Sequence, residues 1–378
     1  MRTDQSNGVT ATDSTLVLDG DRAIELPAIW LRANCPCGSC MDVRNGQRYF
    51  NITDIPERPR IRAVVPDGEG VTITFEPDGH EATFPYSWLL GDGPTATERA
   101  QGRGEDSKRL WTAPELEGEQ LRVDWTEYQR DPRVRYRALA QVVELGFVIL
   151  EGVPSSEGQV LDVARDFGHV RVTNYGSLFD VRVEATPENL AFTGRAISPH
   201  TDNPYRDPTP TMQLLHCLVN EVEGGESGLV DGFNAAAILR REDPRAFQTL
   251  ARTQVTFSYS SPNAELSATR PMIQIDEDGR VRAIHFNNRS MQPPRLPADD
   301  IPEFYRSYRA FAEVLVRPEL QVDFKLAAGD CLVFDNVRLL HARTGFEDSG
   351  GRHLQGCYAD LDALGSTVAL LAREGVAQ

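Results

Sequence analysis

Three residues have the types and the spacing of a metal site that activates oxygen. His200 and Asp202 stand two positions apart in SPHTDNP, and His341 follows much later in DNVRLLHART. In a β-strand, residues two apart point to the same face, so an imidazole nitrogen and a carboxylate oxygen reach one ion. Two histidines and one carboxylate leave three positions of an octahedron open, which suits non-haem Fe(II). The alternative is a chance tripeptide that binds no metal.

The segment after His341 supports the iron interpretation. In GRHLQGCYADLD, Arg352 and Tyr358 share a face if the segment is a strand. A buried guanidinium pairs bidentately with a carboxylate, and the usual co-substrate of such iron enzymes is the dicarboxylate 2-oxoglutarate. We therefore expect Arg352 to bind the far carboxylate of 2-oxoglutarate while the keto acid end of that molecule chelates the metal. The alternative is an ordinary ion pair with one of the many acidic residues.

Length and charge exclude several classes of protein. The chain has 378 residues, and 39 Lys plus Arg against 56 Asp plus Glu give a formal net charge of -17. This charge opposes nonspecific binding to nucleic acid or to anionic membranes. The N-terminus is polar, and no stretch approaches the roughly 20 apolar residues of a membrane span. We expect a cytoplasmic protein without nucleic-acid or membrane partners.

Composition divides the chain into two domains. Residues 15–90 alternate apolar and polar side chains between Asp-Gly turns, which predicts short antiparallel strands. Residues 91–120 are rich in Gly, Pro and charge. We predict a small domain at 1–100, a linker at 101–120 and a catalytic domain at 121–378. Helical periodicity in the catalytic domain occurs in four segments, the first of which ends in a buried strand: 132–154, 157–170, 233–252 and 301–317.

Cysteines in the small domain predict a structural metal site. Cys35, Cys37 and Cys40 form a CxCxxC turn, and His80 follows in a hairpin-like segment of the same domain. Three thiolates and one imidazole complete a tetrahedral zinc site with no position left for a substrate. A metal clip offsets the small core of such a domain. The alternative is free thiols with an exposed His80.

Longer motifs carry a family likeness. The chain resembles the γ-butyrobetaine dioxygenase branch of the TauD/TfdA-like Fe(II)/2-oxoglutarate-dependent oxygenases, whose relatives are trimethyllysine and trimethylaminoethylphosphonate dioxygenases. The likeness rests on WLRANCPCGSC, NLAFTGRAISPHTD, TMQLLHCLVNEVEGGESGLVDGF, IHFNN, GDCLVFDNVRLLHART and RHLQGCYAD. It implies a mainly β fold with flanking helices, in which a double-stranded β-helix (jelly-roll) catalytic domain follows a small antiparallel β zinc-binding domain. It also implies Fe(II), 2-oxoglutarate, O₂, structural zinc and a homodimer.

The resemblance assigns roles to individual residues. Arg352 and Asn189 would hold 2-oxoglutarate beside the iron ligands. Four rings would surround a trimethylammonium group through cation–π attraction: Tyr175, Phe179, Phe192 and Tyr358. The anionic end of the substrate would meet a polar set: Asn287, Asn203, Tyr205, Asn288 and Arg289. The alternatives are core packing for the rings and solvent exposure for Arg289. The animal enzymes are expected to have Trp and Tyr at the positions of Phe179 and Phe192.

These assignments predict a dioxygenase that hydroxylates γ-butyrobetaine to carnitine. An alternative substrate is 2-trimethylaminoethylphosphonate or another quaternary amine. Arg289 favours the phosphonate because a doubly charged group gains more from a guanidinium than a carboxylate does. The alternative from a different class is a noncatalytic metal-binding protein that keeps the β-helix.

Overall fold

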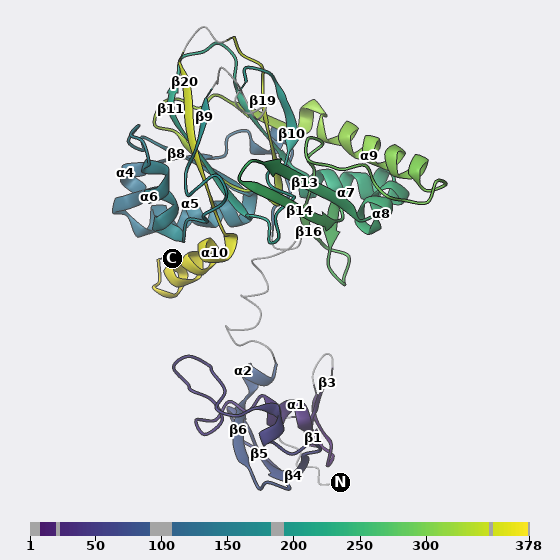
Figure 1. Cartoon of the computed structure of the whole chain (residues 1–378). Coiled ribbons are helices and arrows are strands. Elements are labelled where there is room, and N and C mark those ends of the chain that lie inside the picture. The colour runs from purple at the N-terminus through teal and green to yellow at the C-terminus, as the bar shows by residue number, and fades with distance from the viewer. Residues whose placement is uncertain (1–7, 20–22, 91–107, 183–192, 348–350, 377–378) are drawn as a thin grey trace. The chain divides into compact units, whose positions relative to one another are not determined.

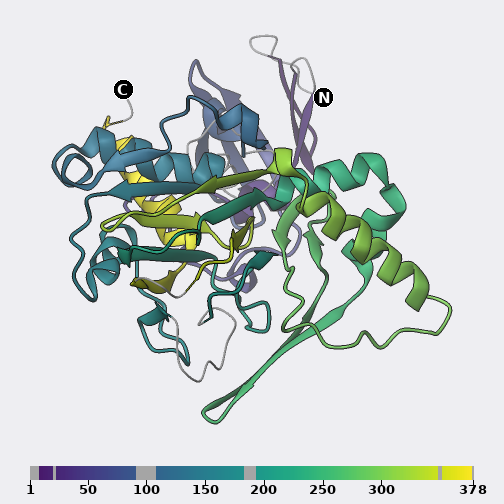
Figure 2. The same ribbon diagram turned by 90° about the horizontal axis from the view of Figure 1, so that it is seen from above.

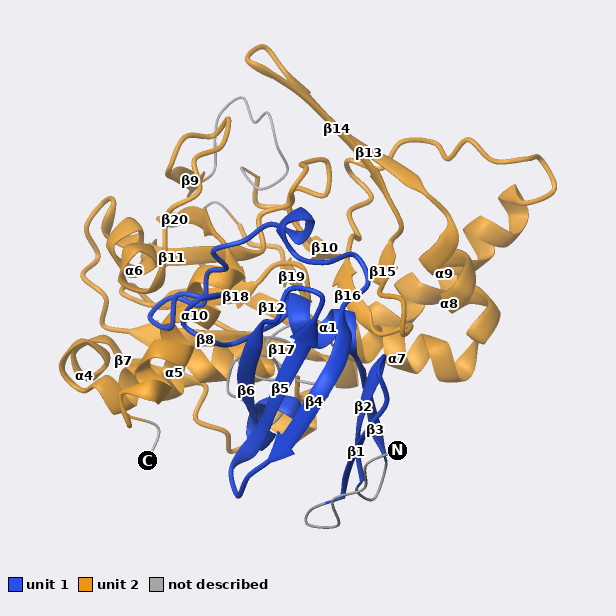
Figure 3. Ribbon diagram, turned by 90° about the horizontal axis from the view of Figure 1, so that it is seen from below, with its two compact units in different colours: residues 1–101 blue, residues 102–378 orange. Residues whose placement is uncertain are grey.

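The computed structural model describes residues 8–19, 23–90, 108–182, 193–347 and 351–376 (Figure 1). The chain forms two compact units, residues 1–101 and residues 102–378 (Figure 3). No helix in the described part of the chain has the length and apolar character needed to cross a membrane.

Unit 1 consists of two small antiparallel sheets, β1-β2-β3 and β4-β5-β6. The strands are β1 (Val9–Ala11), β2 (Thr15–Leu18), β3 (Ile24–Pro27), β4 (Arg60–Pro66), β5 (Gly70–Glu76) and β6 (Glu81–Pro85), with short helices α1 (Ala28–Ala33) and α2 (Tyr86–Leu89). Alternate residues of β5, namely Val71, Ile73 and Phe75, are fully buried. This period of two confirms the predicted strands of this region.

Most strands of unit 2 belong to two sheets. The six-stranded sheet has the order β7-β8-β18-β11-β20-β9, and the four-stranded sheet has the order β10-β19-β12-β17. Only β7 and β8 pair in parallel among these described strands. The strands are β7 (Arg122–Asp124), β8 (Phe147–Glu151), β9 (Phe179–Arg182), β10 (Ile197–His200), β11 (Met212–Asn220), β12 (Ser227–Asp231), β17 (Gln321–Phe324), β18 (Cys331–Asp335), β19 (Leu339–Arg343) and β20 (Arg352–Ala359).

Two further strand pairs lie outside these sheets. They are β13 (Val255–Ser261) with β14 (Ala264–Arg270), and β15 (Ile273–Ile275) with β16 (Val281–Ile284). The β13–β14 hairpin, drawn in green, extends well beyond the body of unit 2 (Figure 2).

Helices flank the sheets in two groups (Figure 1). One group lies beside the six-stranded sheet and consists of α4 (Trp125–Arg130), α5 (Pro132–Leu145), α6 (Gln159–Phe167) and α10 (Leu361–Arg373). The other group consists of α7 (Gly232–Glu242), α8 (Pro244–Arg252) and α9 (Ile301–Leu315). The predicted helices and the buried strand β8 after α5 are confirmed. The prediction of a mainly β fold with flanking helices is therefore confirmed.

The end of the predicted linker is packed inside unit 2. Trp111 is 1% exposed, and its indole N–H donates to the backbone oxygen of Leu145 at 2.8 Å. Lys108 lies 3.6 Å from Asp335 in an almost fully buried ion pair. Residues 108–120 therefore belong to the catalytic unit, in contrast to the predicted start at residue 121. The prediction missed this because the segment is rich in Gly, Pro and charged residues, and its few buried residues, such as Trp111, do not form a pattern.

A buried ion pair connects this segment to the strands that carry the site. Arg338 and Asp231 are 2.7 Å apart, and their side chains are 0% and 1% exposed. Arg338 also donates to the backbone oxygens of Glu144 and Arg109, each at 2.7 Å. Satisfied in this way, the guanidinium is tolerated in the core.

Candidate active site

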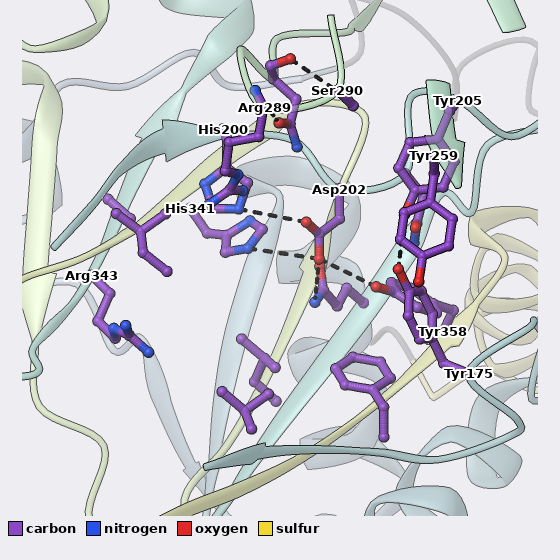
Figure 4. A pocket seen from close by; sticks show the side chains of 18 of the residues that line it. Tyr175, His200, Asp202, Tyr205, Tyr259, Arg289, Ser290, His341, Arg343 and Tyr358 are labelled. Carbon is purple, nitrogen blue, oxygen red and sulfur yellow. Dashed lines mark hydrogen bonds and ion pairs between the residues drawn. The ribbon is translucent and has the colours of Figure 1, made fainter. Parts of the chain in front are cut away.

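The candidate metal ligands come together at two neighbouring strands, two of them on the strands and one just after the first strand. His200, the last residue of β10, lies directly opposite His341 of β19 in the antiparallel register. Asp202 follows the strand, and its Oδ1 lies 3.5 Å from His200 Nε2 while its Oδ2 lies 3.9 Å from His341 Nε2. One ligand atom from each residue lies within 4.8 Å of the others, and the side chains converge (Figure 4). This donor set fits a divalent metal ion with open coordination positions.

Hydrogen bonds orient the ligands. His200 Nδ1 donates to the backbone oxygen of Ser198 at 3.0 Å, which leaves Nε2 for a metal. Asp202 Oδ2 accepts from Gln213 Nε2 at 3.0 Å and from the Tyr358 hydroxyl at 3.2 Å. With Oδ2 occupied by two donors, Oδ1 is the oxygen free to coordinate an ion.

The protonation states suit metal binding. Burial and the neighbouring His200 lower the pKa of His341 to about 3, so this imidazole is neutral at neutral pH. Burial alone would raise the pKa of Asp202, but its contacts with His200 and His341 outweigh burial and hold this pKa below its usual range. A neutral imidazole and an ionised carboxylate are the forms that coordinate metals.

The triad borders a cavity of about 480 Å³. Residues of both large sheets line it, together with residues of β13 and of the segment 287–290. This volume is within the range of about 300–1,000 Å³ typical of small-molecule sites. The charged groups in the lining are Asp202, Arg289, Arg343 and Arg352. Three guanidinium groups against one carboxylate favour anionic ligands.

Aromatic side chains form one wall of the cavity (Figure 4). The ring centroids of Phe179 and Tyr358 are 5.1 Å apart, and Tyr175 lies 6.3 Å from Phe179. Tyr205 stacks on Tyr259 at 5.2 Å, and Tyr175 meets Tyr259 edge-on at 5.7 Å. The hydroxyls of Tyr175 and Tyr205 are hydrogen-bonded at 3.1 Å. The three described rings of the predicted cage therefore lie together, and Tyr259 extends the cluster.

Polar groups lie beside these rings. Asn203 is 3% exposed with a φ of 55°, and its amide nitrogen has no acceptor among the described residues. Asn287 donates to the backbone oxygen of Thr201 at 3.0 Å and accepts from the backbone N–H of Arg289 at 3.1 Å. One amide hydrogen of Asn287 stays available to a ligand. Arg289 lines the cavity yet is exposed, which places it at the opening. Asn288 is exposed and outside the lining, so its predicted substrate contact has no structural support.

Arg352 and Arg343 differ in their partners. Arg352 shares the cavity face of β20 with Tyr358 and is 9% exposed. Its Nε has no hydrogen-bond partner, and no carboxylate of a described residue lies within ion-pair distance. A buried charge without a counter-ion is costly, so an anionic ligand would stabilise Arg352. Arg343 instead donates to the backbone oxygens of Thr193 and Arg195.

Some site residues were not found from the sequence, and others cannot be placed. The predicted residues Asn189 and Phe192 lie outside the described residues. Asn336, which was missed, binds both backbone groups of Asp202, at 2.8 and 2.9 Å. Gln213 and Tyr259 were missed too. A polar residue in the largely apolar segment MQLLHCLVN could have revealed Gln213, whereas no spacing marks the other two.

A second candidate metal centre lies in unit 1. The Sγ atoms of Cys35, Cys37 and Cys40 lie 3.2, 3.6 and 3.5 Å from His80 Nε2. Usual Zn–S and Zn–N bond lengths give a tetrahedral S–N edge of about 3.5 Å. Arg32 Nη1 also donates to Cys40 Sγ at 3.5 Å, which favours a thiolate. The four side chains therefore fit a closed zinc site.

Comparisons with known proteins agree with this geometry. Residues 108–358 match the family described as "Taurine catabolism dioxygenase TauD, TfdA family", and residues 12–90 match the N-terminal part of gamma-butyrobetaine hydroxylase-like proteins.

Individual relatives are similar over most of their length. A gamma-butyrobetaine dioxygenase of Pseudomonas sp. (strain AK-1) is 36% identical over 91% of this chain and 90% of that protein. A trimethyllysine dioxygenase of Meyerozyma guilliermondii is 28% identical over 93% of this chain and 92% of that protein. Among solved structures, AAD-2 in complex with Mn(II) and N-oxalylglycine has a TM-score of 0.50 at 15% identity, covering 66% of this chain and 97% of that one. This last likeness concerns the fold alone.

Proposed function

This chain belongs to the TauD/TfdA family of iron- and 2-oxoglutarate-dependent dioxygenases, and we propose that it hydroxylates an aliphatic C–H bond of γ-butyrobetaine to form carnitine. The observation that carries the proposal is Arg352, a buried cation without a counter-ion among the described residues, in the same cavity as His200, Asp202 and His341. A dicarboxylate whose keto acid end chelates the metal would pair its far carboxylate with this guanidinium.

Each protein group then has a physical task. A bound iron ion would supply the oxidising chemistry together with O₂ and 2-oxoglutarate, which would be converted to succinate and CO₂. His200, Asp202 and His341 would hold the ion on one side, while Tyr358 and Gln213 keep the carboxylate of Asp202 in a single orientation. The remaining task of the protein is to present one C–H bond to the metal, which is positioning rather than proton transfer.

The substrate's cation would lie against the aromatic wall. A quaternary ammonium has no N–H to donate, so the faces of Tyr175, Phe179 and Tyr358 suit it better than oxygen acceptors do. The name of the Pseudomonas relative supports γ-butyrobetaine as the substrate. The unsatisfied amide of Asn203 and the remaining N–H of Asn287 are donors for the carboxylate at the other end.

A phosphonate end group is the second candidate. It is favoured by Arg289, which lines the opening of a cavity that already contains Arg343 and Arg352. Replacing Arg289 by Met separates the two substrates: turnover of 2-trimethylaminoethylphosphonate should fall much more than turnover of γ-butyrobetaine, because a dianion gains more from a guanidinium.

Further expectations concern the architecture and the cell. We propose that the two large sheets of unit 2 constitute a double-stranded β-helix and that unit 1 binds one structural zinc ion. A homodimer is proposed from the family resemblance, and a cytoplasmic location from cysteines that fit metal binding in a reducing compartment rather than disulfides. Sedimentation of the purified protein and zinc analysis test the dimer and the metal.

The reaction is tested by succinate release with Fe(II), 2-oxoglutarate and O₂ in the presence of γ-butyrobetaine, trimethyllysine or 2-trimethylaminoethylphosphonate. The carbon isostere of γ-butyrobetaine is the matched control, because it keeps the shape and the carboxylate and removes only the cation. We expect stimulation by a trimethylammonium compound, weak stimulation by the isostere and no turnover in His200→Ala. Equal stimulation by the isostere would refute the cation site, and activity of His200→Ala would refute the iron site.

A further inference from the structure

Phe346 contacts both buried arginines of the cavity and has no place in the site described above. Its ring centroid lies 5.0 Å from the guanidinium carbon of Arg343 and 5.1 Å from that of Arg352. The ring itself is not part of the cavity lining. Whatever Phe346 does for a ligand, it does through the arginines.

The backbone of Phe346 is held from two sides. Its N–H donates to the backbone oxygen of Gly194 at 3.0 Å, and it forms an antiparallel bridge with Gly224. A Cβ at Gly225 would meet Arg352 Nε at 3.2 Å and Phe346 Cδ1 at 3.3 Å, and the φ of Gly225 is +68°. The absence of a side chain at Gly225 therefore lets the chain fit closely around the ring and Arg352.

We propose that Phe346 is a positioning residue for the co-substrate, holding the guanidinium of Arg352 ready for the far carboxylate of 2-oxoglutarate. This inference rests on the proposed function. The face of an aromatic ring attracts a cation without neutralising it, whereas a carboxylate partner would compete with the ligand.

Preorganisation is the physical gain. An arginine with four flexible torsions loses conformational freedom when it binds an anion, and a side chain already held in place loses less. Burial lowers the pKa of Arg352, yet the group has no acidic partner among the described residues, so it stays available to a dicarboxylate.

The test measures binding by calorimetry in the full-length protein with Mn(II) and without O₂, so that no turnover occurs. The ligands are 2-oxoglutarate and oxalate, because oxalate chelates the metal but has no distal carboxylate. Phe346→Leu keeps apolar volume and removes the ring, and we expect 2-oxoglutarate to bind about 3- to 30-fold more weakly. Oxalate binding should not change, and Phe346→Tyr should restore 2-oxoglutarate binding.

Controls separate this role from packing and from the proposed function. Phe324→Leu, at another half-buried phenylalanine of unit 2, should leave both ligands unaffected. In Arg352→Met, adding Phe346→Leu should cause no further loss, because the ring acts through the guanidinium. In kinetics, Phe346→Leu should raise KM for 2-oxoglutarate and leave kcat unchanged.

Three results would overturn the role of Phe346: unchanged 2-oxoglutarate affinity in Phe346→Leu, equal weakening of oxalate, or no restoration by Phe346→Tyr. A different result identifies failure of the proposed function. If Arg352→Met binds 2-oxoglutarate as tightly as the unaltered protein does, Arg352 is not the co-substrate's partner.

Discussion

Gly356 determines where the aromatic wall of the cavity stands. It lies in β20 directly opposite Phe179 of β9 and Leu215 of β11. A Cβ at this position would lie 2.4 Å from Phe179 Cζ, 2.5 Å from Cε2 and 3.1 Å from the backbone oxygen of Leu214. Normal carbon contacts begin near about 3.5 Å, so in Gly356→Ala the ring has to retreat by about 1 Å.

Two effects follow from that displacement. Overpacking of this kind costs about 1–3 kcal/mol, which lowers the thermal midpoint by several degrees. The ring also leaves its place beside Tyr358, so a trimethylammonium substrate loses part of its cation–π attraction, and its KM should rise by about 3- to 30-fold. KM for 2-oxoglutarate should stay unchanged because Arg352 is not displaced.

The assay compares Gly356→Ala with Gly365→Ala and with Gly356→Ala/Phe179→Leu. Gly365 lies in α10, and a Cβ there would meet nothing within 4 Å, so alanine at this position should stabilise the protein by about 0.5–1 kcal/mol. Leucine at position 179 is smaller than the ring and should return part of the lost stability without restoring KM. A Gly356→Ala variant with unchanged midpoint and unchanged KM would refute the argument that this contact sets the wall.

Four other changes test separate parts of the structure. Arg338→Met leaves Asp231 buried without its ion-pair partner and should lower the free energy of unfolding, measured in urea, by about 3–5 kcal/mol. Arg317→Met removes an exposed pair with Glu242 and should lower it by less than about 1 kcal/mol. Similar losses in the two variants would contradict the argument from burial. Arg352→Met removes a buried charge without a counter-ion among the described residues and should raise the thermal midpoint of the ligand-free protein. A lower midpoint would contradict the conclusion that this charge is unpaired. Cys37→Ser should remove zinc, measured by elemental analysis, and destabilise unit 1; full zinc content would disprove the four-ligand site. Tyr259→Leu should raise the substrate KM by about 3- to 30-fold and spare the KM for 2-oxoglutarate; the reverse pattern would exclude Tyr259 from the substrate wall.

Short-range patterns in the sequence predicted the parts of the site that single elements position. Arg352 and Tyr358 face the cavity because β20 alternates its side chains, as expected. The helices followed from apolar periodicity. In the structure, α5 begins with Asp131 accepting from the N–H of Arg133 and ends at Gly146, which has a φ of 95°.

Contacts that depend on topology were beyond the sequence patterns. Asn336 supports Asp202 from 134 positions away, and this pairing arises only when the strand before each residue takes its place in a sheet. Tyr259 reaches the cavity from a hairpin outside both large sheets, and Phe346 meets Arg352 because its backbone is bonded to Gly194 and bridged to Gly224. The alternation rule also did not apply to Asp202, because β10 ends at His200.

Two separate parts of unit 2 line the cavity, namely the large sheets and the β13–β14 hairpin. His200, His341 and Arg352 lie on strands of the large sheets, whereas Ser258, Tyr259 and Ser260 belong to a separate two-stranded ribbon. We therefore expect substitutions along that ribbon to alter one wall without changing the register of β10, β19 or β20. Sequence changes in this hairpin can therefore change which substrate is oxidised while the metal site stays the same.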